Sequence, residues 1–138
     1  MKIYALAYLA TGLVFLACDM VWLSVTGSSL YRPLLGDLLL EQFRLLPAIG
    51  FYLVYLGGVV FFAVAPAIAA RRWTAALGRG ALFGFVAYAT YDLTNQATLK
   101  SWSTTITMLD LCWGTVLTAV SATLGYVIAT ALARATRR

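Results

Sequence analysis

Four long apolar stretches dominate the chain, separated by short groups of polar and charged residues. Each stretch is about 20 residues or more and lacks the alternation of a membrane strand, so each predicts a membrane-spanning helix. Inside hydrocarbon every backbone polar group must be satisfied internally, and a helix achieves this within one segment. We place the spans at residues 3–26, 45–70, 81–99 and 104–132, which together form a single transmembrane domain over residues 1–138.

The connections between the spans predict how the helices are arranged. Residues 71–80 and 100–103 are short connections, so the helices on either side of each should be antiparallel neighbours. The first connection is longer, and after Pro33 its leucines recur at helical spacing against Asp37, Glu41 and Arg44. This pattern predicts a short interfacial helix, either a tether or a lid, with Pro33 in its first turn. The predicted fold is therefore all-α: an integral membrane, antiparallel four-helix bundle with a short interfacial amphipathic helix after the first span.

Two stripes of small residues predict where the helices pack closely. Gly80 and Gly84 lie four apart in and beside the third span. The fourth span carries a matching stripe of small side chains, namely Gly114, Thr118, Ser121 and Gly125. Small residues at such spacing let two helix backbones approach each other in a membrane. We therefore expect the third and fourth helices to pack along these stripes.

Composition supports a membrane protein and excludes several kinds of chemistry. Of the residues, 62% are hydrophobic and only 11% charged, against about 25% charged in soluble domains. The chain has no histidine, the commonest general base and the usual ligand of zinc, copper and haem. Cys18 and Cys112 form no CxxC pair, which excludes a thioredoxin-type motif. We read both as small apolar side chains, with a pair between the first and fourth helices as the alternative, and predict neither a metal nor a cofactor.

The basic residues are distributed unequally between the two sides. One side would carry seven of them (Lys2, Arg71, Arg72, Arg79, Arg134, Arg137 and Arg138) and the other three (Arg32, Arg44 and Lys100). Because basic residues near helix ends favour the cytoplasmic side, both termini are predicted to be cytoplasmic in a multi-pass protein. The net charge of +5 then reflects orientation and contact with anionic membrane lipids. It does not predict a nucleic-acid partner.

Three of the five acidic residues lie inside the apolar stretches. Asp19 and Asp92 each precede the end of a span by seven residues, and Asp110 follows the start of the fourth span by six. Since the fourth helix runs opposite to the first and third, all three carboxylates fall at one depth in the outer half of the membrane. At about 1.5 Å per residue this depth is roughly 10 Å below the outer face. A charged side chain at the centre of a membrane helix costs about 2.5–3.5 kcal/mol, so three at one level suggest a function.

Other polar side chains accompany the aspartates at this level. On the third helix Tyr88, Asp92 and Gln96 recur every four residues, with Tyr91 and Asn95 beside them. Asp19 and Asp110 are each followed three residues later by a tryptophan on the same helix face, although such a tryptophan can also belong to an interfacial belt. The candidate site thus comprises Asp19, Asp92, Asp110, Asn95, Gln96, Tyr88, Tyr91, Trp22 and Trp113. We expect the three carboxyl groups to converge on one pocket capped by the two tryptophans.

Three roles are open to such a cluster. Carboxylates at close quarters cannot all carry a charge, which suits proton-coupled transport. Oxygen ligands alone also suit a hard cation such as Ca²⁺, Mg²⁺ or Na⁺. In the structural alternative each aspartate accepts a hydrogen bond from a Tyr, Thr or Trp, or pairs with Lys100, and so joins the helices.

Several runs resemble a family of small bacterial membrane proteins, domain of unknown function 2177. The resemblance covers essentially the whole chain, and its most specific parts are Tyr91-Asp92-x-Thr94-Asn95 and Asp110-x-x-Trp113-Gly114-Thr115. The other matching runs are Asp19-x-x-Trp22-Leu23, Gly80-x-Leu82-Phe83-Gly84 and Leu99-Lys100-x-Trp102. The resemblance implies a four-helix protein of the bacterial inner membrane. It implies no particular activity and gives only a general direction towards lipid.

The leading hypothesis is a small transporter or binding protein for a proton, a cation or a small polar or lipid-like solute. A bundle of this size encloses little volume, so a transport path would call for a homodimer, by analogy with four-helix multidrug exporters. One alternative is a lipid-modifying enzyme or its accessory subunit, in which only the aspartates, a tyrosine or Cys18 could supply nucleophile and base. Catalysis is therefore not favoured. The other alternative is a structural membrane partner.

Overall fold

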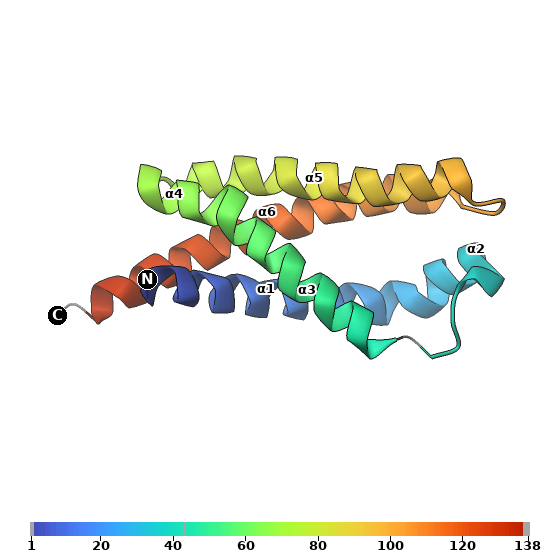
Figure 1. Ribbon diagram of the computed structural model, residues 1–138, viewed down its shortest axis with the longest axis horizontal. Coiled ribbons are helices and arrows are strands. Elements are labelled where there is room, and N and C mark those ends of the chain that lie inside the picture. The colour runs from blue at the N-terminus through green and yellow to red at the C-terminus, as the bar shows by residue number, and fades with distance from the viewer. Residues whose placement is uncertain (1, 43, 137–138) are drawn as a thin grey trace.

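The computed structural model describes residues 2–42 and 44–136 of the chain, and all regular secondary structure in them is helical. These residues form four long helical segments. Figure 1 shows that the segments run alternately in opposite directions, with both chain termini at the same end. The first is α1 (Lys2–Thr26), and the second is built from α3 (Leu45–Val59), a π-helical turn η3 (Val60–Val64) and α4 (Ala65–Ala70). The third is α5 (Trp73–Thr98), and the fourth is α6 (Thr104–Ala135).

The second segment has the predicted bounds, 45–70, but it is not a uniform α-helix. The wide turn η3 lies immediately before Pro66, at the beginning of α4. Proline has no N–H to donate to the carbonyl one turn back, so a helix that passes through it must rearrange its hydrogen bonds locally. Pro47 needs no such adjustment because it lies in the first turn of α3, where N–H groups have no partner within the helix.

The connection between the second and third segments is shorter than predicted. The predicted loop 71–80 is mostly helix, because α5 already begins at Trp73 and the turn consists of Arg71 and Arg72. Arg71 makes this turn with a left-handed backbone, φ 54°. The predicted span begins at residue 81, where the apolar run begins, whereas the helix itself begins eight residues earlier, at Trp73.

The short helix after the first span exists, but it is not separated from that span. The first helix continues from α1 through a π-helical turn η1 (Gly27–Tyr31) into α2 (Arg32–Leu35), with Pro33 in the first turn of α2 as predicted. Gly36, at φ 50°, ends α2 and begins the 3₁₀ turn η2 (Gly36–Leu38). Helical spacing of leucines predicted a longer helix, but residues 39–42 and 44 are not helical.

Within the described residues, three helical segments are long and apolar enough to cross a membrane: Lys2–Leu38, Leu45–Ala70 and Thr104–Ala135. The protein is thus a helical membrane bundle. The helix α5 is not one of the three, because Arg79, its glycines and the polar run from Tyr88 to Gln96 lower its hydropathy. It lies alongside α6 over most of its length (Figure 1).

The α5–α6 contact is closest where the two small-residue stripes meet. A methyl group added at Gly80 would lie 2.9 Å from Cβ of Ala122, and one at Gly84 would lie 2.6 Å from Oγ1 of Thr118. Neither position has room for a side chain, as the sequence predicted. Gly125 is equally crowded, but by Thr11 of α1. Small residues therefore place α6 in direct contact with both α5 and α1.

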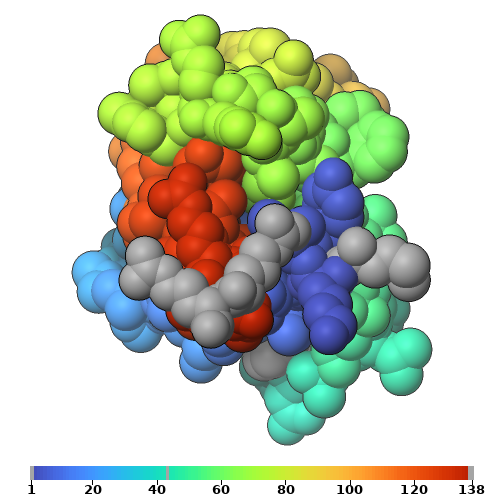
Figure 2. Space-filling view, turned by 90° about the vertical axis from the view of Figure 1, so that its left-hand side faces the viewer, coloured from blue at the N-terminus to red at the C-terminus, as the bar shows by residue number. Residues whose placement is uncertain are grey.

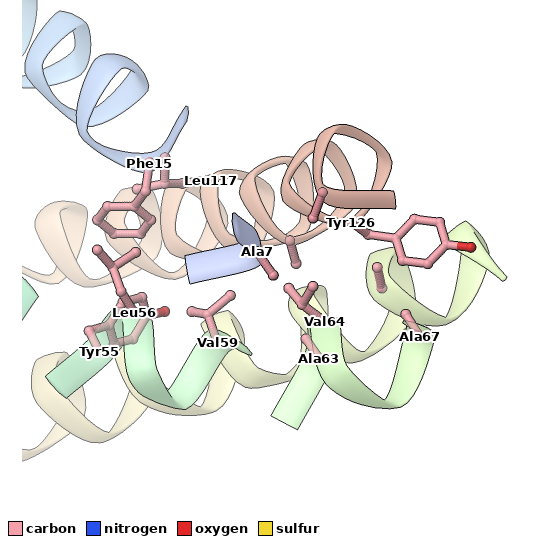
Figure 3. Packing of buried hydrophobic residues seen from close by; sticks show 13 residues of the cluster. Ala7, Phe15, Tyr55, Leu56, Val59, Ala63, Val64, Ala67, Leu117 and Tyr126 are labelled. Carbon is pink, nitrogen blue, oxygen red and sulfur yellow. The ribbon is translucent and has the colours of Figure 1, made fainter. Parts of the chain in front are cut away.

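The second segment crosses the bundle at an angle, which affects the packing at the end that contains Asp19, Asp92 and Asp110 (the acidic end). Its last part, α4, packs on α5, whereas α3 packs on α1, and Figure 1 shows this diagonal path. Buried side chains at the crossing, including Phe15, Leu56, Val59 and Val64, form the apolar core seen in Figure 3. Because α3 leans towards α1, it moves away from α5 at the end that contains the three aspartates.

Candidate ligand site at the acidic end of the bundle

The three aspartates in the spans are buried inside the bundle. Asp19 on α1 is 8% exposed, Asp92 on α5 is fully buried, and Asp110 on α6 is 7% exposed. None of the three side chains is therefore directed to the lipid-facing surface. Their surroundings nevertheless differ, because the three carboxyl groups do not all have a hydrogen-bond donor among the described residues.

Asp19 accepts a hydrogen bond from a tyrosine of the neighbouring helix. The hydroxyl of Tyr52, on α3, lies 2.7 Å from Oδ2 of Asp19. Tyr52 follows the start of its span by seven residues, and Asp19 precedes the end of its own by seven. The two side chains can meet because the helices are antiparallel. This bond fixes α3 against α1.

Asp110 is part of a chain of hydrogen bonds between α1, η1 and α6. Its Oδ1 accepts from the hydroxyl of Tyr31, which in turn accepts from the indole N–H of Trp22 over 3.1 Å. The ring of Trp22 stacks on that of Trp113, with centroids 4.4 Å apart and planes 9° from parallel. Tyr31 thus connects the π-helical turn to the middle of the acidic end. The two tryptophans join α1 to α6.

Asp92 has no such donor. Both of its carboxyl oxygens are buried, and within the described part of the chain neither has a hydrogen-bond partner. Asp92 and Asp19 lie on α5 and α1, and both of these helices pack on α6, which carries Asp110. Burying a polar group without a partner costs about 2–7 kcal/mol, and burying an unpaired charge costs more. Asp92 is therefore the most costly side chain of the cluster.

A crevice of about 430 Å³ opens beside this cluster, between α3, α5 and α6. Its lining consists of Phe51, Tyr55, Ala87, Tyr88, Tyr91 and Asp110. Phe51 and Tyr91 are 47% and 59% exposed and form the rim, whereas Tyr55 and Asp110 are buried. The crevice thus leads from the side of the bundle to a carboxyl group. It occupies the space left where α3 leans away from α5.

The remaining predicted site residues lie around this centre. The ring of Tyr88 lies directly over Gly114, where an added methyl group would overlap it. Tyr91 is at the rim and packs edge-on against Trp102. Asn95 is half-buried, and its backbone carbonyl accepts the N–H of Leu99 at the helix end.

Gln96 and the two cysteines have contacts outside the carboxyl cluster. The side-chain amide of Gln96 donates to Thr104, 2.9 Å away, at the start of α6. Cys18 and Cys112 are free thiols, so the disulfide considered as an alternative is not formed. Among the described residues no three acidic or cysteine side chains are placed to hold a metal ion.

Three tyrosines of the site were not among the predicted residues: Tyr31 and Tyr52, which donate to aspartates, and Tyr55, which lines the crevice and bonds to Thr118. Counting donors by depth on every helix would have identified Tyr52 and Tyr55, seven and ten residues after the start of the second span. Tyr31 could not be found in this way, because it lies beyond the predicted end of the first span.

The fold and the buried acidic residues define a small helical membrane protein with a polar interior at one end. Residues 4–127 match the family described as "Predicted membrane protein (DUF2177)". The chain belongs to this family, as its motifs suggested. No curated protein and no solved structure matches it.

Proposed function

We propose that the protein is a membrane binding protein or transporter that takes up a cationic solute, in exchange for a proton, at the buried carboxyl groups. The observation that carries this proposal is the contrast among the three aspartates. Asp19 and Asp110 accept hydrogen bonds from tyrosine hydroxyls, whereas Asp92 is fully buried and has no donor among residues 2–42 and 44–136. A side chain that is costly to bury and bonds to nothing is better explained by a ligand than by packing.

The coupling between Asp92 and Asp110 provides a mechanism. Without a partner, the buried acid at Asp92 is more stable uncharged, that is, with its proton bound. A cation that reaches Asp110 through the crevice would favour the charged form of Asp92, because opposite charges attract and the two aspartates lie on the packed helices α5 and α6. Proton release from Asp92 and cation binding would then be linked, and by thermodynamic reciprocity each would affect the other.

Proteoliposomes with a trapped pH-sensitive dye test this function. Gradients of Na⁺, K⁺ and the organic cation ethidium are imposed in turn, and the internal pH is followed. We expect at least one of these probes to drive proton movement, and the Asp92→Asn and Asp110→Asn variants to lose it. Asp37→Asn is the matched control, because Asp37 lies in the exposed turn η2. The proposal is wrong if none of the three probes moves protons in the wild-type protein.

We also propose that the protein lies in the bacterial inner membrane with both termini in the cytoplasm and the acidic end in the outer half. The excess of basic residues at the termini and around Arg71 supports this orientation; Arg137 and Arg138 lie outside the described residues. Single cysteines at Arg72 and Asp37, in a Cys18→Ala/Cys112→Ala background, test it with a membrane-impermeant maleimide on intact cells. Labelling should occur at position 37 only. Labelling at position 72 would show that the protein has the opposite orientation to the one proposed.

A further inference from the structure

The walls of the crevice are aromatic, and its inner end is acidic. Phe51 and Tyr55 stack with centroids 5.3 Å apart, and the ring of Tyr88 meets that of Tyr55 edge-on at 6.3 Å. Asp110 lines the same space and is 7% exposed. A ligand in the crevice would therefore touch aromatic rings along its sides and a carboxyl group at its end.

This combination selects among ligand classes. Aromatic faces attract cations, most effectively those with alkyl substituents on nitrogen, because such cations lose little hydration on contact. An anion would be repelled by the carboxylate of Asp110, which lines the crevice. An inorganic cation requires several oxygen ligands, whereas among the described residues lining the crevice only Asp110 is acidic. An organic ammonium group fits both the rings and the carboxyl group.

The position of the opening indicates that the ammonium group is attached to an apolar chain. The rim residues Phe51 and Tyr91 lie six residues after the start of α3 and seven before the end of α5, well inside the predicted spans. A molecule that arrives there comes from the acyl-chain region of the membrane. The volume of about 430 Å³ is within the range of about 300–1,000 Å³ of small-molecule sites.

We infer that the crevice between α3 and α5 is the binding site for an amphiphilic organic ammonium compound, which enters sideways from the membrane and places its cationic head at Asp110. This inference rests on the proposed function and specifies the class of solute.

Equilibrium binding of radiolabelled dodecyltrimethylammonium to the full chain in nanodiscs tests the inference, with protein-free nanodiscs as the baseline. We expect saturable binding that weakens about 10- to 100-fold in Asp110→Asn, the loss for a charged contact of about 1.5–3 kcal/mol. Phe51→Leu keeps an apolar rim but removes a ring, and should weaken binding several-fold. Phe61→Leu is the matched control, because Phe61 is 71% exposed on η3, outside the crevice.

Competition experiments separate the parts of the inference. Dodecanol, which has the same chain and no charge, should compete poorly; equal competition would overturn it, because the head would not be recognised. Tetramethylammonium should also compete poorly; equal competition would overturn the role of the chain and leave the proposed function intact.

A comparison with the liposome experiment separates the two proposals. If no dodecyltrimethylammonium binds but Na⁺ or K⁺ still drives Asp92-dependent proton movement, this inference fails and the proposed function stands. If neither binding nor proton movement occurs, both fail.

Discussion

At the end that holds both termini, the helices meet through alanine and glycine, whereas at the other end they meet through tyrosine, tryptophan and aspartate. Ala67, Ala76, Ala122 and Ala129 are all fully buried at the first end. Figure 2 shows this end from outside, with the α4–α5 turn above the end of α6 and the start of α1. At the acidic end the long side chains of Tyr88, Trp22 and Trp113 occupy the space between helices.

This difference shows how a small bundle can be tightly packed at one end and leave a crevice at the other. In a membrane no hydrophobic effect drives two helices together, so close packing of small residues supplies much of their association. The alanine and glycine end provides that contact. At the other end large aromatic side chains lie between the helices, and α3 leans away from α5 (Figure 1). The crevice at Asp110 is a consequence of this separation.

The largest loss of stability is expected from filling the tight helix contact. Gly84→Val would place its side chain against Thr118 and the backbone of α6, and we expect it to lower the free energy of unfolding by about 3 kcal/mol or more. Thermal unfolding in detergent, followed by circular dichroism, measures the effect. Gly78→Val is the control on the same helix, because nothing lies within 4 Å of an added methyl group there. Equal losses in both variants would mean that α5 and α6 do not pack as described.

A moderate loss is expected from breaking the hydrogen-bond chain at the acidic end. Tyr31→Phe removes the donor to Asp110 and the acceptor of the Trp22 indole N–H, and should destabilise the fold by roughly 1–2 kcal/mol. Tyr4→Phe serves as the control, since Tyr4 is 47% exposed on α1 at the opposite end. The same unfolding measurement applies. If Tyr31→Phe is as stable as wild type, the turn η1 is not held to α6 by this bond.

The smallest effect on stability distinguishes Asp92 from its neighbour. Asp92→Ala relieves the burial of a carboxyl group that has no hydrogen-bond partner among the described residues, but it also leaves a cavity, so the free energy of unfolding should change by less than about 1 kcal/mol, towards greater stability. Asp110→Ala should instead destabilise, because the hydroxyl of Tyr31 loses its acceptor. A marked loss in Asp92→Ala would favour a structural role for this residue over ligand binding.

The long helices, and the position of the three aspartates along them, were predictable from the sequence. Apolar length sets where a helix crosses the membrane, which is why the second segment has the bounds predicted for it, residues 45–70. The regular rise of a helix places the aspartates relative to its ends. The small-residue stripes at Gly80 and Gly84 predicted the closest helix contact for a similar reason, since spacing alone decides which residues share a face.

The tertiary structure alone decided what surrounds each aspartate. Hydropathy fixes depth along the membrane normal, but it leaves open the crossing angle of α3 and the helix with which it packs. These depend on how side chains interlock, and they determine that Tyr52 reaches Asp19, that Tyr31 reaches Asp110, and that Asp92 reaches no donor. The crevice exists for the same reason. A gap between two helices depends on their relative tilt, and the sequence of neither helix determines that tilt by itself.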